Sequence, residues 1–203
     1  MATTTTTTTT PTNYKLPTAV GDPYTTLGCI VSWAWETTAG TRPTGDYAII
    51  YDCTKGLPLG GTPDKLETTT LIQNKWKTNK NGLQDPGDLT IECNWTDTVV
   101  DMHAAWLEFA KSDKGKDKRL WICTQLEGSA KADYTPVKPS SRQVDPPEPN
   151  TVPKYIINFD GEGDPVTAAK PTAYVNQVSS DGTAPNKIFD MSKGTFETPQ
   201  SSS

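Results

Sequence analysis

A short alternating segment near the middle of the chain constrains the fold most strongly. Apolar and polar residues take turns there, and the apolar ones are Leu89, Ile91, Cys93 and Trp95. Successive side chains of a strand point to opposite faces, so the pattern predicts a β-strand with one buried and one exposed face. Asp85-Pro86-Gly87, directly before it, predicts a tight turn, because proline presets φ and glycine tolerates positive φ.

Further strands are predicted from shorter patterns of the same kind. They cover residues 27–35, 47–51, 66–72, 119–126, 154–159, 173–178 and 187–191. In the first of these, Trp33 and Trp35 share the apolar face, and their large apolar area indicates a position in the core. An aromatic platform for sugars would use the same two side chains, and this alternative stays open.

Only one segment has a strong helical pattern, from Thr98 to about Lys111. Its apolar stripe recurs at steps of three and four residues and consists of Val99, Met102, Trp106, Phe109 and Ala110. Thr98 and Asp101 have the spacing of a capping box. His103, the single histidine, flanks the stripe and is expected to be structural. Many strands with one helix predict a mainly β fold: a β-sandwich or open β-barrel with one flanking α-helix and long loops.

The chain is predicted to form a single domain with loose ends. Residues 1–26 contain an unbroken threonine tract and several prolines, which predict a flexible N-terminal arm. Residues 27–198 are predicted to form one β domain, and residues 199–203 a frayed C-terminus. Within the domain, residues 128–153 are polar and rich in proline, which indicates a linker or a long excursion.

Composition and motifs narrow the function classes. The net charge of -5 argues against tight binding of nucleic acid, which depends on lysine and arginine. No apolar run could span a bilayer and no secretory signal is visible, so synthesis in the cytoplasm and no membrane contact are expected. The four cysteines are too widely spaced for a zinc site and are expected to be reduced and buried. Without a recognisable catalytic motif, phosphate loop or metal cluster, we expect no enzyme, no metal and no cofactor.

The central part of the chain resembles the major tail tube proteins of long-tailed bacteriophages. The resemblance covers roughly residues 27 to 126 and rests on the order of several motifs. These are a Glu-x-Thr-Thr-Leu strand at 67–71, an extended loop at 75–81, a Gly-Leu-x-Asp-x-Gly-Asp turn at 82–88, the alternating strand and the single helix. The proline-rich segment departs from the family pattern, in which strands follow the helix more closely.

The resemblance implies a structural virion protein rather than an enzyme. Its subunits would form hexameric rings that stack into a hollow tail tube, through which DNA passes without specific binding. The implied partners are further copies of the chain, the tape measure protein, and the tail-tip and tail-terminator proteins. The implied location is the phage tail in the virion, and the host cytoplasm during assembly.

Contacts between subunits are expected in three segments. The residues are Tyr14, Leu16 and Tyr24 in the arm, Glu67, Thr68, Thr69 and Thr70 in a polar strand, and Lys75, Trp76 and Lys77 in the following loop. Polar β-branched strands suit pairing across subunits through the backbone, and the family's corresponding loop packs between stacked rings. Trp76 could equally fold back onto its own domain.

Glu67 and Glu92 are expected to face the lumen, because they project opposite the apolar faces of their strands. Negative charge there would repel DNA phosphates and let the DNA slide. Two other functions stay open. One is a different virion component, such as a tail-tip or decoration protein, and the other is a carbohydrate-binding β-sandwich that uses Trp33, Trp35 or Trp76.

Overall fold

The protein is described by a computed structural model over residues 13–16, 29–58, 62–67, 79–85, 89–126, 128–146, 148–177, 185 and 187–198, with the backbone alone for 62–67 and 79–85. Its elements are β1 (Tyr14–Lys15), β2 (Cys29–Trp35), β3 (Asp46–Ile49), β4 (Cys53–Lys55), β5 (Thr62–Glu67), β6 (Asn79–Asp85), β7 (Leu89–Asn94), α1 (Asp97–Lys111), β8 (Leu120–Leu126), β9 (Lys131–Val144), β10 (Lys154–Gly161), β11 (Val166–Ala169), β12 (Ala173–Tyr174), β13 (Ile188–Asp190) and β14 (Thr195–Glu197).

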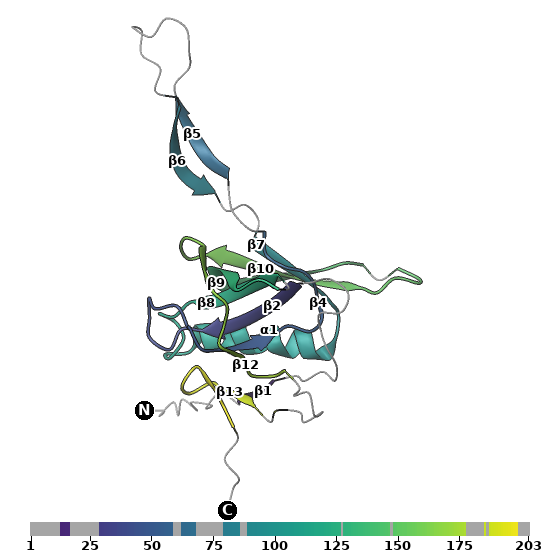
Figure 1. Cartoon of the computed structure of the whole chain (residues 1–203). Helices are drawn as coiled ribbons and strands as arrows, with labels where there is room; N and C mark the ends of the chain where they lie inside the picture. The colour runs from purple at the N-terminus through teal and green to yellow at the C-terminus, as the bar shows by residue number, and fades with distance from the viewer. Residues whose placement is uncertain are drawn as a thin grey trace, which may run out of the picture.

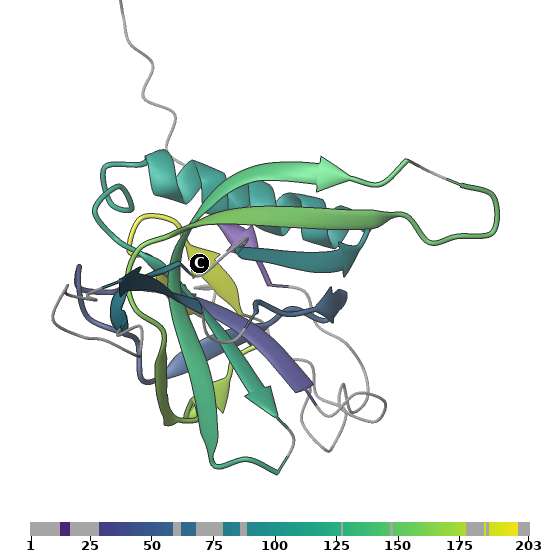
Figure 2. The ribbon, with the colours of Figure 1, turned by 90° about the horizontal axis from the view of Figure 1, so that it is seen from above.

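Most strands belong to one large curved sheet, seen from two directions in Figures 1 and 2. Its strand order is β12-β3-β2-β8-β9-β10-β7-β4, with β11 added beside β9. The helix α1 lies along one face of this sheet (Figure 1). The described residues therefore confirm the predicted mainly β fold with a single flanking helix.

The main core lies between this sheet, α1 and a small sheet of order β1-β13-β14. Trp33 of β2 is 1% exposed and occupies its centre, where its ring makes edge contacts with Trp106 of α1 and Phe189 of β13, both at 5.3 Å between centroids. Trp35 is equally buried, against Phe109. Both tryptophans are thus core residues, as predicted, and neither can serve as a sugar-binding platform.

The sheet also buries part of its opposite face. A second cluster consists of Ala34, Tyr47, Trp121, Cys123, Ala132 and Tyr134. Because β2, β8 and the first half of β9 are covered on both sides, these central strands lack a polar face. This explains why apolar and polar residues alternate clearly in β7, which has one exposed face, and only weakly in β2, which has none.

The N-cap of the helix lies two residues earlier than the sequence pattern predicts. Its N-cap is Thr96, whose hydroxyl accepts a hydrogen bond from the Val99 backbone N–H at 3.3 Å. The same hydroxyl donates to a carboxylate oxygen of Asp52 at 2.8 Å. The predicted capping box at Thr98 is therefore wrong, because Thr98 already lies inside the helix. The strand before it also ends sooner, at Asn94, and Trp95 is 44% exposed rather than in the core.

Replacing Thr96 with alanine is expected to lower the free energy of unfolding by about 1 kcal/mol, because it removes the N-cap acceptor. Thr96→Ser is the matched control, since serine keeps a hydroxyl for both hydrogen bonds. Urea denaturation followed by far-UV circular dichroism measures both variants. Equal losses in the two variants would contradict this role of the hydroxyl.

Residues 128–153, predicted as a linker or a long excursion, are not a linker, because residues 131–144 form the long strand β9. Two prolines hide it in the sequence, but each lies where one side of the strand has no ladder partner. Pro136 falls between the residues paired with β11 and those paired with β10, while Pro139 lies beyond the pairing with β8, which ends at Val137. A missing N–H at such positions disrupts no ladder hydrogen bond.

The region predicted as a loop and a turn over 75–88 is partly strand. Residues 79–85 form β6, which pairs antiparallel with β5 over 62–67, with a register shift after Pro63. The predicted strand at 66–72 overlaps β5 only at its end. Six of the seven residues of β6 are polar or glycine, with Leu83 as the exception, so its sequence has neither alternation nor strong β propensity. Residues 86–88, which contain the predicted proline-glycine turn, lie outside the described residues.

The N-terminal region contains four described residues, and these are attached to the domain. β1 pairs antiparallel with β13, and Leu16 is 2% exposed within the main core. The predicted flexible arm therefore does not include residues 13–16.

Three further strands were too short to predict: β4, β11 and β14.

Candidate assembly surfaces

The exposed face of β7 and β10 is the first candidate surface. Leu89, Ile91 and Cys93 of β7 point into the core beneath α1. The residues that alternate with them form the opposite side, which we call the polar face. It consists of Thr90, Glu92, Asn94, Lys154, Ile156 and Asn158.

Glu92 lies on the polar face, opposite the core side of its strand, and its carboxylate forms an ion pair with Lys55 of β4 at 2.6 Å. Lys154 of β10 donates to Asn94 at 2.8 Å and to Thr54 at 3.3 Å. The carboxylate of Glu92 is therefore compensated by a neighbouring lysine. The polar face carries mixed charges and uncharged hydrogen-bonding groups rather than an excess of negative charge. The pairing of Glu92 with Lys55 was not predicted, because β4 is too short to show a pattern.

The hairpin formed by β5 and β6 is the second candidate surface. It extends from the chain between β4 and β7 and stands away from the main sheet in Figure 1. Its extensive backbone contacts are those between its own two strands. Of the predicted contact residues, Glu67 ends β5, with its backbone alone described. Tyr24, Thr68, Thr69, Thr70, Lys75, Trp76 and Lys77 lie outside the described residues.

The two arm residues predicted to contact other subunits have different surroundings. The backbone of Tyr14 pairs with Phe189 in the small sheet. Leu16 is enclosed by its own subunit, so its side chain offers almost no surface to a neighbour.

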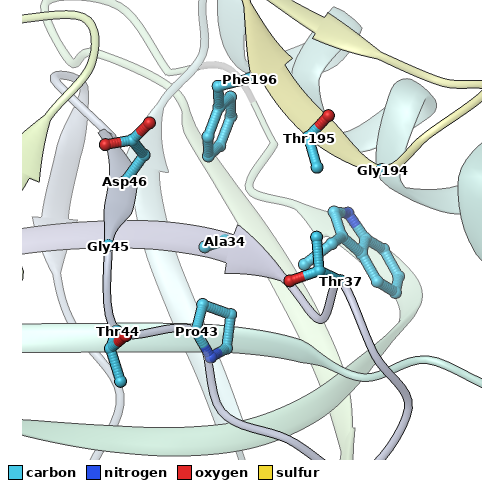
Figure 3. A pocket seen from close by; sticks show the side chains of 10 residues that line it. Ala34, Thr37, Pro43, Thr44, Gly45, Asp46, Gly194, Thr195 and Phe196 are labelled. Carbon is cyan, nitrogen blue, oxygen red and sulfur yellow. The ribbon is translucent and has the colours of Figure 1, made fainter.

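A shallow cavity of about 260 Å³ opens beside the end of β2 (Figure 3). It is bordered by Ala34 and Trp35, by the loop that enters β3, and by residues 194–196. Asp46 is the one charged side chain among its described lining residues. The other polar side chains of its described lining are the hydroxyls of Thr37, Thr44 and Thr195.

Glu36 forms the most connected polar site in the core. Its side chain is 0% exposed and accepts hydrogen bonds from the Gly40 N–H at 2.8 Å, the Trp121 indole at 2.9 Å, and the Arg119 side chain at 2.7 Å. The Arg119 backbone N–H donates to the same carboxylate at 3.2 Å. This network joins the end of β2 to the start of β8 and is structural. No sequence pattern identifies Glu36 as a buried residue, because a single acidic residue after a strand is also common in exposed loops.

His103 is buried, at 2% exposed, and its Nδ1 lies 2.9 Å from the Tyr155 hydroxyl. This position confirms the predicted structural role. The pKa of His103 is lowered to about 4, chiefly by burial and also by the positive charge of Arg142, while a hydrogen bond with the Ser140 backbone offsets part of the shift. The ring is therefore uncharged in the folded protein at neutral pH.

The shift predicts a loss of stability in acid. Between its ordinary pKa of 6.5 and about 4, His103 binds a proton in the unfolded chain but not in the folded one. Unfolding is favoured as pH falls through this window, by up to about 3 kcal/mol at roughly 1.4 kcal/mol per pKa unit. The measurement is the free energy of unfolding from pH 7 to pH 4 for the parent and His103→Asn. The difference between the two should change across the window, and a constant difference would contradict the prediction.

The described part of the chain contains no helix with the length and apolarity needed to span a bilayer. Within the same residues, no three histidine, cysteine or acidic side chains gather as metal ligands would. All four cysteines are free; Cys93 and Cys123 are buried, while Cys29 and Cys53 are partly exposed.

These features define a mainly β protein with one curved sheet, one helix and a projecting hairpin. No protein-family model and no curated protein matches the chain. Several solved chains resemble the fold. One of them comes from the cryo-EM structure of the anti-feeding prophage (AFP) baseplate, 6-fold symmetrised. It is 12% identical with a TM-score of 0.49, and the match covers 73% of this chain and 97% of that one.

Proposed function

We propose that this chain is a structural subunit of a phage tail, and specifically that it forms the stacked hexameric rings of a tail tube. The observation that carries the proposal is the β5–β6 hairpin. An isolated two-stranded hairpin is marginally stable in water at best. The extensive backbone contacts described for β5 and β6 are with each other, so we expect this hairpin to pack against another subunit. Rings with heterologous contacts supply such a partner for each hairpin in turn.

The ordered motifs between Glu67 and the helix support the same proposal, because they resemble the tail tube family. The arrangement of β7 also fits a conduit: one face is buried beneath α1, and the other is polar. In a ring, that polar face would line the lumen. DNA would then contact hydroxyls, amides and balanced charges. Such a surface binds phosphates less tightly than a basic surface does, and it does not repel them strongly.

The mass of the purified chain in solution tests the ring proposal. Light scattering over a range of concentrations should detect particles whose mass is a multiple of six chains, each of 22.0 kDa. A chain that stays monomeric even when a tail-tip complex is supplied as a nucleus would contradict the proposal. Binding of glycans by such a monomer would instead favour a carbohydrate-binding module.

The proposed lumen position of Glu92 makes a separate prediction. Glu92→Gln leaves Lys55 without its ion-pair partner, so the polar face becomes more positive and DNA should pass more slowly. Virions carrying Glu67→Gln and Glu92→Gln together should show slower genome release. Glu108→Gln is the control, because Glu108 lies exposed on α1, away from the polar face. Unchanged release in the double variant would contradict the lumen assignment.

A further inference from the structure

Cys53 and Cys93 lie directly opposite each other on the antiparallel strands β4 and β7. Both face the main core, in which Cys93 is 0% exposed and Cys53 packs at the margin. Cys29 of β2 also packs against this core. The two opposed cysteines are forty positions apart in the sequence, so their spacing gives no sign of the pairing.

The hydrogen bonds around this pair determine its geometry. The Asn94 N–H donates to the Asp52 carbonyl at 2.9 Å, and the Cys53 N–H donates within its own turn, to Ile50, at 3.3 Å. The backbone hydrogen bond between the two strands therefore joins the neighbouring residues Asp52 and Asn94. Cys53 and Cys93 do not exchange backbone hydrogen bonds and form a non-hydrogen-bonded pair. In such pairs the Cα atoms are about 4.5 Å apart and the side chains are closest. That separation is inside the range of roughly 4.4–6.8 Å found for disulfides.

We propose that Cys53 and Cys93 are an oxidisable thiol pair, which closes into a disulfide between β4 and β7 when a small-molecule disulfide such as oxidised glutathione is present. This inference goes beyond the proposed tail function and does not depend on it. The structure describes the reduced form, in which both thiols are free.

The reaction is a thiol–disulfide exchange in two steps. The Cys53 thiolate attacks one sulfur of oxidised glutathione, forms a mixed disulfide and releases one glutathione thiolate. Cys93, deprotonated in turn, attacks the Cys53 sulfur and releases the second glutathione. The two protein thiols together lose two protons and two electrons, and oxidised glutathione is reduced to two thiols.

The surroundings of the two thiols assign the first step to Cys53. Cys53 is partly exposed, whereas Cys93 is fully buried. A hydrogen bond from Cys93 lowers the pKa of Cys53, and the same bond together with burial raises the pKa of Cys93. The accessible thiol is thus also the more easily ionised one, as the attacking group requires.

The disulfide would fasten the base of the β5–β6 hairpin. The chain between Cys53 and Cys93 contains both hairpin strands. At one end of this segment, β4 has three residues and is an edge strand that pairs with β7 alone. A covalent link would hold this short edge in place and restrict the segment at both of its ends.

The test uses the full chain incubated with oxidised glutathione under native conditions. Thiol titration should fall from four reactive groups in the denatured protein to two, and peptide mapping without reductant should recover the Cys53–Cys93 peptides as one species. A persistent glutathione adduct on Cys53 of the parent protein, or a link between Cys29 and Cys53, would overturn the proposal. Both readouts come from the parent chain and need no variant to fold.

Variants separate the two steps. Cys93→Ser should accumulate the mixed disulfide on Cys53, and Cys53→Ser should leave Cys93 unmodified over the same time. Cys123→Ser is the matched control, because Cys123 is equally buried but lies in the second core cluster. It should form the Cys53–Cys93 link as the parent does. Loss of the link in that control would overturn the assignment.

Discussion

A chain in which residues 62–85 are replaced by a short glycine-serine linker is expected to fold but to lose all ring or tube assembly. Among the residues whose side chains the structure describes, the main and second core clusters are built from residues outside this segment. Its removal should therefore leave the far-UV circular dichroism of the domain and its unfolding transition close to those of the parent. Assembly should fail, because the hairpin is the proposed contact with the next subunit. Light scattering and electron microscopy of the variant measure this loss.

A smaller change identifies which part of the hairpin segment matters. Alanine at Lys75, Trp76 and Lys77 together should weaken assembly strongly if these residues contact the neighbouring ring, as the resemblance implies. Truncating a buried interface tryptophan commonly costs about 2 kcal/mol or more.

Two outcomes for the variant lacking residues 62–85 would contradict this account. If that variant assembles normally, the hairpin does not contact the neighbouring subunit. If it unfolds, the hairpin is required for the fold of its own subunit.

Replacing Glu36 with alanine is expected to lower the free energy of unfolding by about 3–5 kcal/mol. The substitution leaves the partly buried Arg119 without its counter-ion and the Trp121 indole N–H without its acceptor. It also removes the acceptor that fixes the Gly40 N–H in the turn after β2. Each donor left unpaired adds a desolvation cost, so the loss exceeds that of an ordinary surface ion pair.

Glu36→Gln and Asp113→Ala are the comparisons for this effect. Glutamine keeps one acceptor oxygen but loses the charge, so its cost should fall between those of the parent and Glu36→Ala. Asp113 pairs with Lys116 at 3.4 Å with its side chain 96% exposed, and its loss should cost less than about 1 kcal/mol. Chemical denaturation measures all three variants. A cost for Glu36→Ala no larger than that for Asp113→Ala would contradict the role of the network.

The elements predicted correctly are those whose pattern is visible within a few residues. β7 alternates because it has one buried and one exposed face, and α1 has a continuous apolar stripe. Trp33 and Trp35 were assigned to the core because large apolar side chains dominate burial. Glu92 was placed on the exposed side of its strand by the same alternation.

The features that were missed depend on contacts far apart in the sequence. β9 is concealed by Pro136 and Pro139, and only the pairing of its neighbours explains why they are tolerated. The ion pair of Glu92 and the pairing of Cys93 require β4, whose three residues give no local pattern. Thr96 and Thr98 are both suitable N-cap residues by sequence. The position at which β7 leaves the sheet decides that Thr96 is the N-cap.

The central claim is that this chain assembles into rings that stack as a hollow tube. Negative-stain electron microscopy of the purified protein at high concentration tests it most directly. We predict six-fold rings in end views and hollow tubes in side views. A uniform field of single subunits, unchanged when a tail-tip complex is added as a nucleus, would contradict the claim.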